Sequence, residues 1–199
     1  MTQLYATYQS KKKEIDARLS QFKQLSQKEY FNEFLYCLLT PASNAQRCWK
    51  AVQELATLKT WNQNAIAQIL VKYTRFHNRK AARVVQAPSV FKEVLPHLNQ
   101  SNKLELRNMI AKNVDGYGLK EASHFLRNIG KSDNQVAILD RHILKHLALH
   151  KVIQTQEIKT QKHYLEIEQQ FIKFAQKQNI PLDHLDLVFW SAENGEVFK

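Results

Sequence analysis

The chain has 199 residues, of which 44% are hydrophobic and 24% charged, enough for one compact unit or two small lobes that share a core. Lys and Arg outnumber Asp and Glu by 29 to 18, and the net charge of +11 favours a polyanionic partner, nucleic acid before an anionic membrane surface. The only cysteines are Cys37 and Cys48, which excludes a disulfide framework and a four-cysteine iron–sulfur cluster.

The N-terminal segment MTQLYATYQSKKKEIDARL carries charges with no apolar stretch behind them. This is the pattern of neither a secretory signal nor a membrane span. The sequence therefore predicts a reduced, cytoplasmic protein with no membrane partner.

Apolar residues recur at steps of three and four along most of the chain, which places them on one face of successive helices. Clear runs occur at residues 31–39, 49–55, 66–70, 106–110 and 167–174. Alternating, strand-like runs are hard to find. The pattern predicts an all-α protein of about ten helices.

Short breaks separate these helices. Ser43 and Gln46 have the spacing of a capping box at the start of one helix. Further along, Pro88 and Pro96 bracket a short helix, and Pro181 opens the last one.

Residues 115–118, Asp-Gly-Tyr-Gly, separate two helices and hold two of the chain's four glycines. Glycines one residue apart let the backbone turn sharply and expose its amide groups. Because exposed amides beside a helix N-terminus bind phosphate oxygen, Gly116 and Gly118 are candidates for contact with a DNA backbone. A tight helix–helix turn without a ligand explains the same spacing equally well.

A lysine follows this hairpin at once, and the segment LDRHIL lies downstream of it. In this combination the sequence resembles the helix–hairpin–helix DNA glycosylases of the endonuclease III superfamily. GYGLKEASHFLRNIG and AILDRHIL are similar in particular to the type-2, archaeal-style 8-oxoguanine DNA glycosylase/lyases. The resemblance extends to LLTPASNAQRCWKAV, to VKYTRFHNRKAARVV and to the final lysine, so it covers most of the chain.

The resemblance implies two helical lobes with a helix–hairpin–helix motif and a DNA-binding cleft between them. One lobe is expected at residues 29–133, and the other at residues 1–28 plus 134–199. The implied activity is bifunctional: excision of a flipped-out 8-oxoguanine from double-stranded DNA, then cleavage of the abasic strand by β-elimination. Such an enzyme is expected to act as a monomer, without a metal, an iron–sulfur cluster or another cofactor.

Two residues match the catalytic positions of that family. Lys120 is similar in position to the amine that attacks the sugar C1′ and forms a Schiff base, although phosphate contact alone is a plainer role for it. Asp140 matches the carboxylate that stabilises positive charge on the sugar as the base departs. Asp140 also suits a helix N-cap, and the two roles are compatible.

The chain end is too apolar for a loose tail, and in the resembling family the terminal lysine helps to tell 8-oxoguanine from guanine. Guanine lacks the N7–H of 8-oxoguanine, so an acceptor near Lys199, either the terminal carboxylate or a nearby carbonyl, would discriminate the two bases. Trp190 or Phe189 is a candidate for stacking on the extruded base. Core packing is at least as good an explanation for each aromatic ring.

Three histidines, His142, His146 and His150, lie at steps of four and would share one helical face. No HExxH motif accompanies them, so an exposed polar face explains them better than a metal site does.

Two other groups of polar residues have both a DNA-facing and a plain explanation. A basic cluster suits either phosphate contact or a solvated face; its members are Arg75, Arg79, Lys80 and Arg83. Ser43 and Asn44 lie where the superfamily has a loop facing DNA, and helix capping explains them equally well.

Two alternative functions stay open. An endonuclease III-like enzyme would remove oxidised pyrimidines, but many such proteins carry a four-cysteine iron–sulfur loop, and no cysteine follows Cys48. A non-catalytic helix–hairpin–helix DNA-binding protein would need the hairpin and the basic charge but not the pair of Lys120 and Asp140. That pair favours the enzyme.

Overall fold

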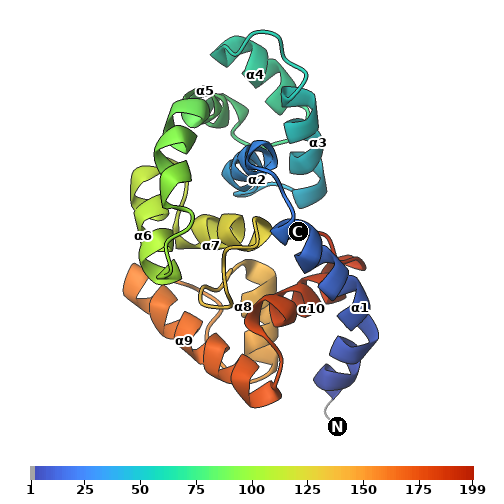
Figure 1. Ribbon diagram of the computed structural model, residues 1–199. Helices are drawn as coiled ribbons and strands as arrows, with labels where there is room; N and C mark the ends of the chain where they lie inside the picture. Colours follow the sequence, from blue (N-terminus) through green and yellow to red (C-terminus); the bar gives the residue numbers. More distant parts are fainter. Residues whose placement is uncertain (1–2) are drawn as a thin grey trace. The chain divides into compact units, whose positions relative to one another are not determined.

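The computed structural model describes residues 3–199. Within this range it contains ten α-helices, one short 3-10 helix and no strand, so the predicted all-α class is confirmed (Figure 1). No helix of the described range is both long enough and apolar enough to cross a membrane.

The chain divides into two compact units. One unit is contiguous and comprises Leu25–Phe125, whereas the other combines Met1–Gln24 with Leu126–Lys199. The first boundary lies between the first two helices and the second falls inside α7 (Leu119–Asn128). Sequence reasoning had placed these boundaries after residues 28 and 133.

The contiguous unit holds five complete α-helices and the 3-10 helix. They are α2 (Gln27–Leu39), α3 (Ala45–Leu55), α4 (Gln63–Leu70), α5 (His77–Val94), η1 (Leu95–His97) and α6 (Lys103–Asn113). Its core includes a group of aromatic rings, with Phe34 lying 5.1 Å from Tyr117 and 5.5 Å from Phe125 between ring centroids. Because the Tyr117 hydroxyl donates to the Phe34 carbonyl at 2.8 Å, the hairpin is tied to α2.

The observed bounds of α3 and α5 correct two predictions made from the sequence. Asn44, not Ser43, caps α3, and its side chain accepts from the Arg47 amide at 3.0 Å. Ser43 is unavailable because its hydroxyl accepts from the Arg75 amide and from a buried lysine. Pro88 lies inside α5 instead of ending it, because residues on both sides of the proline are buried on one face of this helix.

The second unit contains α1 (Gln3–Lys23), α8 (Arg141–Leu149), α9 (Gln161–Gln178) and α10 (Leu182–Asn194). Helices α1 and α10 pack together, although they stand at opposite ends of the sequence. A buried ion pair lies in this unit, where Arg127 Nη2 is 3.3 Å from Asp186 Oδ2. The same guanidinium lies over the ring of Phe22 from α1.

Candidate active site

The turn between α6 and α7 requires its first glycine. Gly116 has a φ of +93°, in the region that side chains rarely adopt, and a Cβ there would lie 2.9 Å from the side chain of Arg83. Arg83 is held in place by two hydrogen bonds of 3.0 Å to the Asp115 carboxylate. These bonds also lower the pKa of Asp115 below its usual value.

Gly118 plays a different part, because its φ is not positive and its amide already has a partner. The Gly118 N–H donates to Glu121 Oε2 at 3.0 Å. The other oxygen of this carboxylate, Oε1, is 2.9 Å from Lys120 Nζ. The structure therefore brings Gly116, Gly118 and Lys120 together at the start of α7, and adds Glu121 to them.

A second lysine lies buried near Lys120. Lys80 Nζ donates to the carbonyls of Leu39 and Pro41 at 2.7 and 2.8 Å and to the Ser43 hydroxyl at 2.9 Å. Burial is the main cause that lowers the pKa of Lys80 to about 8, and the charges of Arg83 and Lys120 contribute to the same shift. Lys80 thus fixes the loop that follows α2.

The predicted basic cluster is consequently divided. Lys80 is buried and Arg83 is paired with Asp115, which leaves Arg75 and Arg79 exposed to solvent. Beside them Phe76 is 61% exposed in a left-handed backbone conformation, and the Arg75 guanidinium lies over its ring at 5.4 Å. Sequence reasoning missed this exposed aromatic, since a single phenylalanine in a short loop resembles a core residue.

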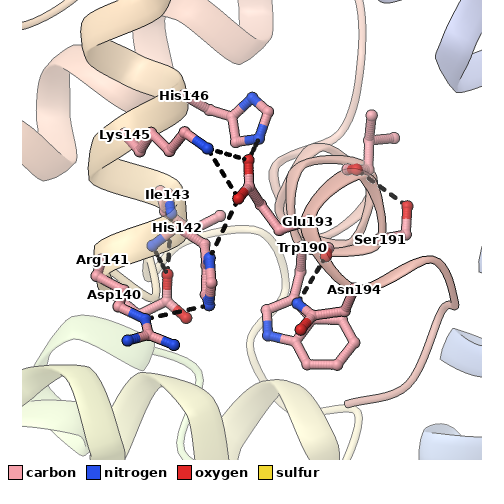
Figure 2. Close-up of polar contacts among 11 residues, drawn as sticks. Asp140, Arg141, His142, Ile143, Lys145, His146, Trp190, Ser191, Glu193 and Asn194 are labelled. Carbon is pink, nitrogen blue, oxygen red and sulfur yellow. Dashed lines mark hydrogen bonds and ion pairs between the residues drawn. The ribbon is translucent and has the colours of Figure 1, made fainter.

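Asp140 is the N-cap of α8, as its position in the sequence suggested. Its Oδ1 accepts from the amides of His142 and Ile143 at 2.8 and 2.9 Å (Figure 2). Among residues 3–199 no hydrogen bond reaches the second oxygen, Oδ2. The cap fixes the carboxyl group while leaving one of its oxygens available.

Glu193 of α10 joins this helix to α8 (Figure 2). Its carboxylate is 2.9 Å from Lys145 Nζ, 3.1 Å from His146 Nε2 and 3.8 Å from His142 Nδ1. Two of the predicted histidines therefore contact a neighbouring helix rather than forming an exposed face. Burial lowers the pKa of His146. In the described part of the chain, no group of three or more Cys, His, Asp or Glu residues is arranged to hold a metal ion.

The two candidate aromatics of α10 lie in different environments. Phe189 is 1% exposed and stacks on His146 at 4.6 Å, on His150 at 5.5 Å and on Phe171 at 6.1 Å, as a core residue does. Trp190 is 9% exposed and lies 6.1 Å from the ring of Phe198.

The chain end is held against α1. The Val197 amide donates to Glu14 Oε1 at 3.2 Å, and Arg18 Nη2 donates to the Val197 carbonyl at 3.4 Å. Lys199 is 7% exposed, with its ammonium 5.9 Å from the centre of the Phe22 ring. Sequence reasoning missed Glu14 and Arg18, because charged residues along a polar helix carry no sign of a distant partner.

The predicted site residues thus fall into two sets, each well defined within its own unit. Gly116, Gly118 and Lys120 belong to Leu25–Phe125, whereas Asp140, the aromatics of α10 and Lys199 belong to the other unit. An amine after a glycine hairpin and a carboxylate fixed at a helix start are the groups that a DNA glycosylase with lyase activity requires.

Comparison with known proteins agrees with this class. The family model described as 8-oxoguanine DNA glycosylase matches residues 15–180. An 8-oxoguanine DNA glycosylase/AP lyase of Fusobacterium nucleatum is 35% identical over 96% of this chain and 94% of its own length. A relative of the same name from Methanocaldococcus jannaschii is 32% identical over 93% of this chain and 91% of its own.

Solved structures give the same result. The 8-oxoguanine DNA glycosylase of Thermotoga maritima superposes with a TM-score of 0.89 at 28% identity, over 98% of this chain and 96% of that one. The M. jannaschii enzyme, crystallised with a 15mer DNA containing 8-oxoguanine, superposes with a TM-score of 0.86 at 30% identity over all of both chains. The chain belongs to the 8-oxoguanine DNA glycosylase family.

Proposed function

We propose that this protein excises 8-oxoguanine from double-stranded DNA and then cleaves the abasic strand, with Lys120 as the nucleophile and Asp140 as the catalytic carboxylate. The observation that carries the assignment is the placement of Lys120 directly after the glycine hairpin, at the N-terminus of α7, in a member of this family. The proposed activity is the one named for the relatives from F. nucleatum and M. jannaschii.

The chemistry assigns one step to each residue. The neutral amine of Lys120 attacks C1′, the C1′–N9 bond breaks, and the base leaves with its bonding electrons and takes up a proton. The nitrogen at C1′ then loses a proton and the C1′–O4′ bond breaks, with O4′ taking up a proton, which gives the Schiff base. The Schiff base acidifies the sugar C2′ hydrogen, so that loss of this proton expels the 3′ phosphate by β-elimination. Asp140, fixed through Oδ1 by two backbone amides, offers Oδ2 to the positive charge that develops on the sugar.

For base recognition we propose Trp190 and the chain end at Lys199. Both residues are largely buried, and the contacts of Val197 with Glu14 and Arg18 hold the end of the chain at a fixed place on α1. An acceptor fixed there distinguishes a base that carries N7–H from one that does not. Phe189 stacks on His146 in the core and supports α10 beside Trp190, so base contact by Phe189 stays a prediction.

For DNA binding we propose the hairpin glycines together with the exposed residues Arg75, Phe76 and Arg79. The net charge of +11 supports attraction to the phosphate backbone, and we propose that the protein acts on nucleoid DNA as a monomer. We propose no iron–sulfur cluster for this protein, because such a cluster is held by four cysteines and the sequence contains two.

The test is borohydride trapping on a duplex that contains 8-oxoguanine. Wild-type protein should form a covalent adduct, and Lys120→Gln should abolish both the adduct and strand cleavage while sparing duplex binding. Asp140→Asn should slow base release severely and still allow some trapping on a preformed abasic site. Lys112→Gln, which removes an exposed lysine from the preceding helix, serves as the matched control.

Two results would contradict the proposal. An adduct formed by Lys120→Gln would show that another amine is the nucleophile. Trapping by the wild type on oxidised pyrimidines but not on 8-oxoguanine would assign the protein to the other substrate class.

A further inference from the structure

Glu121 contacts both groups that the proposed function assigns to the start of α7. One oxygen of its carboxylate accepts from the Gly118 amide at 3.0 Å, and the other is 2.9 Å from Lys120 Nζ. The side chains of Lys120 and Glu121 are 24% and 13% exposed, so the pair is largely shielded from solvent. The Glu121 carboxylate therefore binds two groups at once. One is the Gly118 amide, which we expect to bind a DNA phosphate, and the other is the Lys120 amine, which we expect to attack the sugar.

Helix capping explains only half of this arrangement. Gly118 precedes the first residue of α7 and Glu121 is its third, so the bond from the Gly118 amide is the glutamate half of a capping box. The contact with Lys120 has no such cause, because neighbouring residues on a helix point in different directions. The lysine side chain has to turn back toward Glu121 to make it.

A DNA phosphate and this carboxylate cannot occupy the same amide. Both are anions, and an anion bound at the start of α7 would repel the other at close range in a partly buried position. An ammonium group that is held in an ion pair also has no free electron pair with which to attack C1′. The contacts of Glu121 therefore link the arrival of a phosphate to the release of the nucleophile.

We propose that Glu121 is a positioning residue that holds the Gly118 amide and Lys120 together in the DNA-free protein, and that a backbone phosphate displaces it and frees Lys120. This inference rests on the proposed role of Lys120. Glu121 keeps the amine from reacting with stray aldehydes and confines its reactivity to bound DNA.

The informative variant is Glu121→Gln. Glutamine also serves in a capping box, so this change removes the charge and keeps the cap. The control is Glu105→Gln, which removes the same charge from the exposed first turn of α6. Equal melting temperatures for wild type and both variants would establish that the fold is intact.

The first measurement needs no DNA. Reductive methylation by formaldehyde and cyanoborohydride, followed by peptide mass spectrometry, gives the rate at which Lys120 itself is modified. Loss of a partly exposed ion pair should raise this rate about two- to five-fold in Glu121→Gln and leave it unchanged in Glu105→Gln. Equal rates in wild type and Glu121→Gln would overturn the proposal.

The second measurement is borohydride trapping on a preformed abasic site, together with binding of undamaged duplex. In Glu121→Gln trapping should be faster, because the amine no longer has to leave the carboxylate, and undamaged duplex should bind more tightly, because no anion competes with phosphate for the Gly118 amide. Unchanged trapping with unchanged binding would leave Glu121 as a helix cap only. If instead Lys120→Gln still forms an adduct, the proposed role of Lys120 as the nucleophile is wrong. The methylation rates still test separately whether Glu121 restrains the Lys120 amine.

Discussion

Lys80 carries a charge in a place where most proteins would put an apolar side chain. It is 3% exposed, and its ammonium donates to two carbonyls and a hydroxyl at the end of α2 and in the loop that follows. These three acceptors favour the charged form, whereas burial disfavours it and lowers the pKa to about 8. The balance between the two makes the stability of this loop sensitive to pH.

The direction of that dependence follows from the two pKa values. Between the folded value of about 8 and the ordinary value of 10.5, the unfolded chain binds more protons at Lys80 than the folded chain does. The contribution of Lys80 to the free energy of unfolding should therefore rise with pH across this window, by up to about 1.4 kcal/mol per pH unit. Below the window both states are charged and the contribution is constant.

Urea unfolding of wild type and Lys80→Met at several pH values checks this expectation. The free energy of unfolding of wild type minus that of Lys80→Met should rise with pH within the window. The contributions of the other titrating groups cancel in this difference. A constant difference would mean that the three acceptors fully compensate the burial of the charge.

At the scale of single residues, the sequence predicted local features better than distant contacts. The N-cap at Asp140 is such a local feature and is confirmed, whereas the catalytic roles of Lys120 and Asp140, taken from a local motif, stay predictions. Glu14 and Arg18 were not found, because their partner Val197 lies at the other end of the chain. Such contacts depend on tertiary packing, which no local pattern encodes.

At the scale of structural elements, the geometry of the hairpin predicts the effect of replacing Gly116. Gly116→Ala places a Cβ at a positive φ and 2.9 Å from Arg83, so it should cost about 1–3 kcal/mol of stability. Displacement of Arg83 and the turn should raise Kd for damaged and undamaged DNA alike. Duplex binding and urea unfolding measure the two effects.

Gly195→Ala is the matched control for this change. Gly195 has a φ of +83°, but a Cβ there would meet nothing within 4 Å, so it isolates the backbone cost from the contact with Arg83. A change of damage preference without a change of overall affinity in Gly116→Ala would contradict phosphate binding by the hairpin.

The segment at the chain end gives a second prediction. Removal of Lys199 moves the terminal carboxylate by one residue and deletes an ammonium that lies over Phe22. The fold should survive, because the hydrogen bonds of Val197 with Glu14 and Arg18 remain when Lys199 is removed. Discrimination of 8-oxoguanine from guanine should fall roughly ten- to two-hundred-fold, the effect of one lost hydrogen bond to a charged acceptor.

The comparison uses wild type and a chain ending at Phe198, each on 8-oxoguanine duplex and on a preformed abasic site. Selective loss on the first substrate supports base recognition by the chain end. Unchanged activity on both, with an unchanged preference over guanine, would remove Lys199 from the site.

The helices themselves were largely predictable, since apolar spacing follows the period of the helix wherever one face is buried. The residues at which the helices begin and end were less predictable. Ser26 and Glu29 form a complete capping box that sequence reasoning overlooked, while the box predicted at Ser43 is replaced by Asn44. Pro88 shows the same limit, because burial of one face of α5 outweighs the local preference of proline to end a helix.

For the whole molecule, the net charge predicts a binding constant that depends steeply on salt. The logarithm of the affinity should fall linearly with the logarithm of salt concentration, by about 0.9 for each phosphate neutralised. Arg79 is exposed, and its charge helps to lower the pKa of Asp115 in the hairpin, so it lies near the expected phosphate contacts. Arg79→Ala should reduce the slope by about one and weaken binding to all sequences.

Fluorescence anisotropy with a labelled duplex at several salt concentrations gives both slopes. Lys112→Gln is again the control for loss of one exposed positive charge. A slope that stays the same in Arg79→Ala would place the phosphate contacts elsewhere on the protein.

The discontinuous unit also sets an order of events during synthesis. Leu25–Phe125 is one continuous stretch and can fold as soon as it leaves the ribosome. Helix α1 emerges first, yet the apolar residues that it buries, Tyr8, Ile15 and Phe22, belong to a unit whose remainder is made last. Until Leu126–Lys199 emerges, this apolar stripe has no native neighbour from the rest of its own unit, so α1 is a natural binding site for a chaperone on the nascent chain.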